Sequence, residues 1–288
     1  MLLRSALMAA IAALAGCRNP DCLDGGACAE APICDQVEFS CTDFALYVGR
    51  AGDAPGGAAL ARGQATADDI VLRNGRVTAV LDALDQPHDL APTGGNLIDL
   101  GPTGGGDDVN VIYQLAGILP DDAFAYDSIE IIDQAPALVA VVLHGRLDGR
   151  PDVEVATRYE LHPCDPGVRV RSELRNRSPD DQVFIVADAA HWGKRRVLPF
   201  TPRAGEGFLQ PELDLIELQD SWATFPYVAA RAAAPGSTAY GLVRCDADRL
   251  EGVNDPEISA LGTARTLVRP GERLVLERML LAADGSGG

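Results

Sequence analysis

The stretch from residue 188 to residue 196 holds the side chains best suited to recognise a ligand. Asp188, His191, Trp192 and Lys194 lie close together in the chain, and Lys194 is its only lysine. An indole ring can stack on a sugar while carboxylate, imidazole and ammonium groups hydrogen-bond its hydroxyls. These four residues are therefore candidates for binding a sugar or an acidic glycan. The alternative, which we favour, is that Trp192 fills one end of the core and that Lys194 and the two arginines after it offset nearby carboxylates.

No pattern in the sequence predicts a catalytic centre, a cofactor or a metal ion. The four histidines are scattered singly, whereas a histidine-based metal site needs them clustered. The glycine-rich stretch 104–108 lacks the Lys-Ser/Thr pair of a phosphate-binding loop. The stretch 246–251 begins like a calcium loop, yet Glu251 replaces its obligatory glycine. We therefore assign no catalytic, cofactor-binding or metal-binding residue.

The sequence Leu14-Ala15-Gly16-Cys17 decides the compartment that we expect for the chain. Arg4 and an apolar run from Ala6 to Ala15 precede the cysteine, and this run is shorter than the roughly 20 apolar residues of a membrane-spanning helix. The arrangement resembles the signal of bacterial lipoproteins, in which Cys17 carries the lipid. Because Arg18 follows the cysteine, the resemblance implies a cell-envelope protein anchored by lipid in the outer membrane. The alternative is an ordinary signal peptide with Cys17 in a disulfide.

Lipidation of Cys17 leaves six of the seven cysteines, an even number that suits disulfides in an oxidising compartment. Cys164 and Cys245 each lie at the end of an expected strand, and we predict that they form a disulfide with each other. The other four lie in a short Gly-, Pro- and Asp-rich segment, where two bridges would staple it: Cys22, Cys28, Cys34 and Cys41. Zinc is the alternative there, but these cysteines lack the close pairs of a zinc knuckle.

The composition limits the possible partners. The formal net charge is −18 at pH 7, because 42 acidic residues outweigh 24 lysines and arginines. A surface of this sign repels nucleic acid, so we expect no nucleic-acid partner. Hydrophobic residues make up 47% of the chain, which is enough to bury a core.

Short apolar or alternating segments between turn residues predict antiparallel strands along most of the chain. Asn74-Gly75, between the segments 69–73 and 76–81, predicts a hairpin with a type I′ turn. The segments 153–161 and 168–175 alternate apolar and charged residues, which predicts a hairpin with one face in water. Only 211–225 is ambiguous, and we expect a short helix there. The other expected strands are 44–48, 96–100, 126–133, 137–143, 182–187, 227–232, 238–244, 266–269 and 272–281.

Strands without alternating helices predict an all-β fold, an antiparallel β-sandwich with a short disulfide-rich N-terminal segment. We divide the chain into a lipoprotein signal peptide (1–16), a lipidated cysteine-rich spacer (17–43), the sandwich domain (44–283) and a flexible tail (284–288).

Several stretches carry a family resemblance: GGNLIDL at 94–100, YDSIEIID at 126–133, RYELHPCDPGVRVR at 158–171, and DAAHWG followed by PFTPRAGEGF at 188–208. They resemble the N-terminal β-sandwich module of myxobacterial-type lipoproteins. The resemblance implies a supersandwich of the galactose-mutarotase type, a module that often precedes a PHP-type metal-dependent hydrolase domain. The sequence ends where that hydrolase would begin, so the resemblance implies no hydrolase activity here.

Two classes of function remain open. The first is a non-catalytic cell-envelope lipoprotein whose sandwich binds carbohydrate or an envelope protein. The second is a carbohydrate-active enzyme of the epimerase or lyase type, or an accessory module of a metal-dependent hydrolase. A pocket on a sheet face that gathers a histidine and a carboxylate would favour the enzyme, whereas a flat or filled face would favour the binder.

Overall fold

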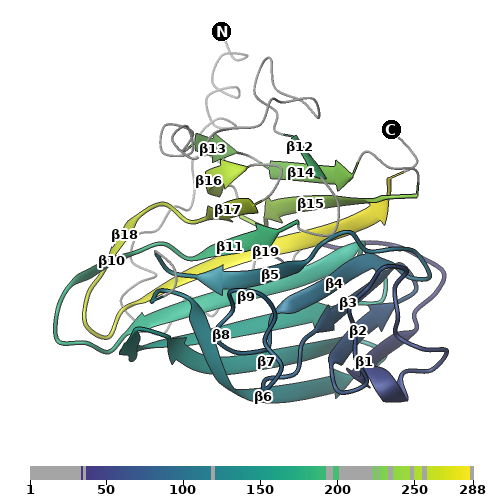
Figure 1. The fold of residues 1–288 in the computed structure, drawn as a ribbon, viewed down its shortest axis with the longest axis horizontal. Coiled ribbons are helices and arrows are strands. Elements are labelled where there is room, and N and C mark those ends of the chain that lie inside the picture. The colour runs from purple at the N-terminus through teal and green to yellow at the C-terminus, as the bar shows by residue number, and fades with distance from the viewer. Residues whose placement is uncertain are drawn as a thin grey trace, which may run out of the picture.

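The computed structural model describes residue 34 and residues 37–117, 121–192, 197–200, 223–225, 227–232, 236–246, 250–254 and 258–285. In this part of the chain two large antiparallel sheets pack against each other as a sandwich (Figure 1). The predicted all-β sandwich is therefore confirmed. Cys17, Cys22, Cys28 and residues 211–222 of the stretch expected to hold a short helix lie outside the described residues, whereas 223–225 form a strand.

One sheet has nine strands in the order β1-β2-β3-β4-β5-β11-β17-β16-β13. Their bounds are β1 (Leu46–Arg50), β2 (Ile70–Asn74), β3 (Val77–Leu81), β4 (Leu97–Pro102), β5 (Val111–Leu115), β11 (Ala187–His191), β13 (Ala223–Phe225), β16 (Leu250–Asn254) and β17 (Ile258–Gly262). A one-turn 3-10 helix, η3 (Ala51–Asp53), follows β1.

The other sheet has eight strands in the order β12-β14-β15-β19-β9-β8-β7-β6. Their bounds are β6 (Phe124–Gln134), β7 (Leu138–Leu147), β8 (Arg150–Leu161), β9 (Gly167–Asn176), β12 (Val197–Phe200), β14 (Tyr227–Ala232), β15 (Thr238–Arg244) and β19 (Arg273–Asp284). The strands β10 (Gln182–Phe184) and β18 (Thr266–Val268) form a separate two-stranded ribbon. Figure 1 shows the N-terminal strands β1 to β4 lying across the long teal strands β6 to β9.

The main core lies between the two sheets. Leu72 and Val77 enter it from the nine-stranded sheet, and Val155 and Leu174 enter it from the eight-stranded sheet. A second apolar cluster lies on the opposite side of the nine-stranded sheet. Both faces of β2 to β5 are therefore covered by apolar side chains.

The hairpin predicted at Asn74-Gly75 is confirmed, but its turn is of another kind. Neither residue has the positive φ that a type I′ turn needs. Instead the Oδ1 atom of Asn74 accepts hydrogen bonds from the backbone N–H groups of Arg76 and Val77, both at 2.8 Å. Its Nδ2 atom donates to the carbonyl of His162 at 2.7 Å. Asn74 therefore shapes the turn through its side chain and ties it to the loop before β9.

The predicted disulfide between Cys164 and Cys245 is wrong. Cys245 pairs with Cys34, with a Cα–Cα distance of 4.9 Å, and Cys164 pairs with Cys41 at 5.4 Å. The reason is the sheet order, because β19 separates β15, which leads to Cys245, from β9, which follows Cys164. Two strand spacings span about 10 Å, beyond the roughly 7 Å limit for a disulfide. Cys34 and Cys41 therefore do not bridge within the spacer but fasten it to the sandwich.

None of the described segments contains a helix that is long and apolar enough to cross a membrane.

Candidate functional site

Three of the four candidate residues, Asp188, His191 and Trp192, are described, and they do not form one surface. Asp188 on β11 points into the space between the two sheets, and only 1% of it is exposed. The Nε atom of Arg278 donates to its carboxylate at 2.7 Å, and a second guanidinium nitrogen bonds the other oxygen. Gln114 donates to the same carboxylate at 3.0 Å. The Asp188 carboxylate is thus held inside the sandwich, away from any ligand at the surface.

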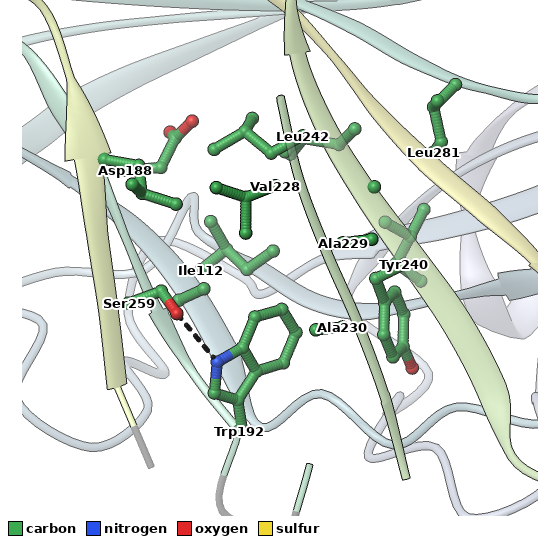
Figure 2. Close-up of a pocket in the computed structure, with 15 residues that line it drawn as sticks. Ile112, Asp188, Trp192, Val228, Ala229, Ala230, Tyr240, Leu242, Ser259 and Leu281 are labelled. Carbon is green, nitrogen blue, oxygen red and sulfur yellow. Dashed lines mark hydrogen bonds between the residues drawn. The ribbon is translucent and has the colours of Figure 1, made fainter. Parts of the chain in front are cut away.

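Trp192 is also buried, with 5% of its surface exposed. Its Nε1 atom donates to Oγ of Ser259 at 3.1 Å, and its ring centre lies 5.6 Å from that of Tyr240. Figure 2 shows Trp192 and Asp188 beside a cavity whose other walls are mostly apolar. This cavity measures about 30 Å³, whereas one water needs about 10–15 Å³ and a ligand pocket measures roughly 300–1,000 Å³. A sugar ring does not fit there, and Trp192 packs as a core residue.

His191 lies at the surface, at the end of β11. Its Nδ1 atom is 3.3 Å from Oδ2 of Asp89, to which Nδ2 of Asn110 also donates. Lys194, the fourth candidate, lies outside the described residues. The structure therefore places Asp188 and Trp192 in the interior and leaves only His191 of the three at the surface.

A much larger cavity lies on the solvent-facing side of the eight-stranded sheet, and we call it the outer groove. It measures about 470 Å³, which is within the range of small-molecule pockets, roughly 300–1,000 Å³. Strands β6, β7, β8 and β9 form it. Its lining includes Asp127, His144, Arg146, Glu154, Ala156, Glu173 and Arg175.

The antiparallel register sets the layout of the outer groove. Ala156 on β8 lies opposite His144 on β7 and, on its other side, opposite Glu173 on β9. Neighbouring strands are about 4.8 Å apart, so the Cα atoms of His144 and Glu173 are about 10 Å apart. Only the methyl group of Ala156 lies between them. The floor is thus low where an imidazole and a carboxylate face each other across it.

The next row of the groove carries charges of both signs. Glu154 lies opposite Arg146 on β7 and Arg175 on β9. The carboxylate of Glu154 accepts a hydrogen bond from Nε of Arg177 at 2.8 Å. This bond and the nearby charges of Arg175 and Arg146 hold the pKa of Glu154 below its usual value. Glu154 therefore stays ionised at neutral pH as a fixed acceptor in the groove wall.

The N-terminal segment crosses the same sheet face at the far end of β9. The guanidinium of Arg169 donates to the carbonyl of Val37 at 2.6 Å and also to that of Cys34. Beside it, Glu160 accepts a hydrogen bond from the ring of His162 at 2.7 Å. Although burial alone would raise the pKa of Glu160, its hydrogen bonds hold that pKa below the usual value. This end of the face is therefore closed by bonded groups, whereas the outer groove is open.

Sequence reasoning did not single out the groove residues. The predicted hairpin of 153–161 and 168–175 is confirmed as β8 and β9, and its water-facing positions include Glu154, Ala156 and Glu173. The alternation of apolar and charged residues along this hairpin indicated which side chains of β8 and β9 face the groove. His144 joins the groove only because β7 pairs with β8, and as one isolated histidine it gave no sign of this.

No group of three or more His, Cys, Asp or Glu side chains in the described segments is placed to hold a metal ion.

No family model matches the sequence, and neither does any curated protein. Solved structures do resemble it. An α-galactosidase from Geobacillus stearothermophilus, solved with stachyose, aligns at a TM-score of 0.51 and 10% identity, covering 75% of this chain and 40% of that one. A galactose mutarotase-like protein from Lactobacillus casei aligns at 0.46 and 11% identity, covering 75% of this chain and 100% of that one.

A galactose mutarotase related enzyme from Lactobacillus acidophilus aligns at a TM-score of 0.43 and 8% identity, covering 76% of this chain and 98% of that one. The likeness is one of fold. At such low identity it says nothing about activity or substrate. The chain spans less than half of the α-galactosidase.

Proposed function

We propose that the protein is a lipid-anchored cell-envelope protein that binds carbohydrate in the outer groove. The observation that carries this proposal is the low floor at Ala156 between His144 and Glu173, in a cavity of about 470 Å³. A sugar needs hydrogen-bond donors and acceptors around a ring-sized space. No described residue forms a hydrogen bond with the imidazole of His144, so this ring keeps its donor and acceptor for a ligand.

The anchor belongs to the same proposal. Lipid on Cys17 would hold the sandwich at the membrane, with the outer membrane as the expected site. Cys34, held by its disulfide to Cys245, fixes the point at which the N-terminal segment joins the domain. A lipoprotein placed in this way could work beside an envelope protein or a separately encoded hydrolase.

The binding proposal is tested by titrating the purified full-length protein with a panel of envelope and plant-type oligosaccharides. Ala156→Trp fills the groove floor and should abolish binding. Ala283→Trp is the matched control, because Ala283 is an exposed alanine on β19 of the same sheet, and it should bind like the wild type. If Ala156→Trp has the melting temperature of the wild type and binds sugar equally well, the sugar binds outside the groove.

A second function, acid–base catalysis on a sugar, is favoured by one observation. His144 and Glu173 face each other across Ala156, and an imidazole with a carboxylate can serve as general acid and general base. If the protein is an enzyme, Glu173→Gln should lose turnover while it keeps most of its affinity. Product analysis of any sugar that binds distinguishes catalysis from binding, since recovery of the sugar unchanged supports binding alone.

A further inference from the structure

Arginines gather around the outer groove although the chain as a whole is strongly acidic. Four consecutive cross-strand rows on β19, β9, β8 and β7 lie on the outer side of the eight-stranded sheet, and the N-terminal segment covers the row of Arg169 and Glu160. Against a formal charge of −18 for the chain, these rows carry more positive than negative groups. The arginines are Arg146, Arg158, Arg169, Arg171, Arg175 and Arg273, and the glutamates are Glu154, Glu160, Glu173 and Glu277.

Two of these rows place arginines directly opposite each other, an arrangement that is destabilising unless a negative group intervenes. In one row, Arg171 faces Arg158. Each of these two has a carboxylate partner, Glu277 at 2.5 Å for Arg171 and Glu160 for Arg158. That row is therefore neutralised by the protein itself.

The other row is compensated less closely. Arg273 faces Arg175, and the nearest ion pair of Arg273 is a long one, 3.7 Å to Glu173. Glu154, the cross-strand neighbour of Arg175, bonds Arg177 instead. No hydrogen bond or ion pair joins the Arg175 guanidinium to any described residue. Arg175 thus lines the outer groove with its donors available.

We propose that the outer groove selects an acidic sugar, a uronic acid whose carboxylate is bound by Arg175. This inference rests on the proposed sugar-binding function. The planar guanidinium offers two parallel N–H groups, which match the two oxygens of a carboxylate better than a neutral hydroxyl. The sugar ring would lie over Ala156, and its hydroxyls would reach His144 and Glu173, which border that floor.

The test is a calorimetric titration of the full-length protein with trigalacturonate, its methyl ester and a sulfated galactan fragment of equal length. The ester keeps the sugar but removes the charge. Wild type should bind trigalacturonate about 10- to 100-fold more tightly than the ester, as expected for a hydrogen bond to a charged group. Arg175→Gln should lose this preference but still bind the ester. Arg273→Gln, on the same row but outside the groove lining, should keep it.

The two proposals fail in different ways. Equal affinity for trigalacturonate and its ester would overturn the acidic-sugar inference and leave sugar binding standing. Tighter binding of the sulfated fragment would also overturn it, in favour of a tetrahedral anion. No binding of any of the three, together with no binding across the wider sugar panel, would contradict the proposed function itself.

Discussion

At the scale of single residues, a substitution of Trp192 tests whether this side chain belongs to the core or to a ligand site at the surface. It is 5% exposed and its ring packs beside Tyr240. Trp192→Ala should therefore lower the free energy of unfolding by about 3–5 kcal/mol, measured by chemical denaturation. Trp192→Phe keeps most of the buried ring and should cost less. If Trp192→Ala leaves stability unchanged but abolishes sugar binding, the tryptophan belongs to a ligand site instead.

Asp82 provides a second test, through pH. Its side chain is fully buried and accepts hydrogen bonds from the backbone of Asn96 at 2.6 Å and from the ring of His88 at 3.0 Å. Burial, only partly opposed by these bonds, raises the pKa of Asp82 to about 6. The folded state therefore holds this proton more tightly than the unfolded state, whose pKa is about 3.9.

The stabilisation from the protonated Asp82 should be complete below about pH 4 and should be lost as pH rises to about 6. Two pKa units correspond to about 3 kcal/mol. Asp82→Asn lacks this titration, so the stability of wild type relative to the variant should fall over that range and stay constant above it. Denaturation curves of both proteins at several pH values measure the difference. A difference that does not change between pH 4 and 6 would contradict the raised pKa.

At the scale of elements, the Asp188–Arg278 ion pair joins the two sheets, because β11 belongs to one and β19 to the other. Both side chains are buried. Asp188→Ala would leave the Arg278 charge without its partner and should cost about 3–5 kcal/mol. The double variant Asp188→Leu with Arg278→Met removes both charges, so it should recover much of that loss. Equal instability of the single and double variants in urea would contradict this account.

The two disulfides between described cysteines link elements far apart in the chain, with sequence separations of 211 and 123 residues. Peptide mapping without reduction should find Cys34 joined to Cys245 and Cys41 joined to Cys164. Cys41→Ser with Cys164→Ser should cost about 2–5 kcal/mol, since the unfolded chain loses a constraint over a long loop. A peptide that joins Cys164 to Cys245 would show the observed pairing to be wrong.

At the scale of the whole molecule, the lipid anchor proposed at Cys17 is expected to set where the domain resides. Cys17→Ser should leave the protein unlipidated and absent from the membrane fraction, because the lipid is the proposed anchor. Sugar binding by the same variant should match the wild type, since the outer groove is formed by β6 to β9. Processing that remains sensitive to globomycin in Cys17→Ser would argue against Cys17 as the lipidated residue.

The sequence by itself determined those features that depend on neighbouring residues. Alternation predicted β8 and β9 and the face that each turns to water, because successive side chains of a strand point to opposite sides. The expected strands 227–232 and 238–244 match β14 and β15 residue for residue. The strands β5, β16 and β17 were not predicted, although the equally short β2 and β3 were.

Only the tertiary structure decided which distant residues meet. The sequence made Asp188 a candidate for binding a ligand at the surface. Its partner in the structure, Arg278, lies 90 positions away, and no local pattern indicates that pair. Cys164 and Cys245 are each at a strand end, but the insertion of β19 between their strands assigns them other partners. The outer groove likewise exists because strand order and register bring His144, Ala156 and Glu173 into one row. Order and register depend on long-range pairing, which is selected by burial of the whole sheet rather than by any single segment.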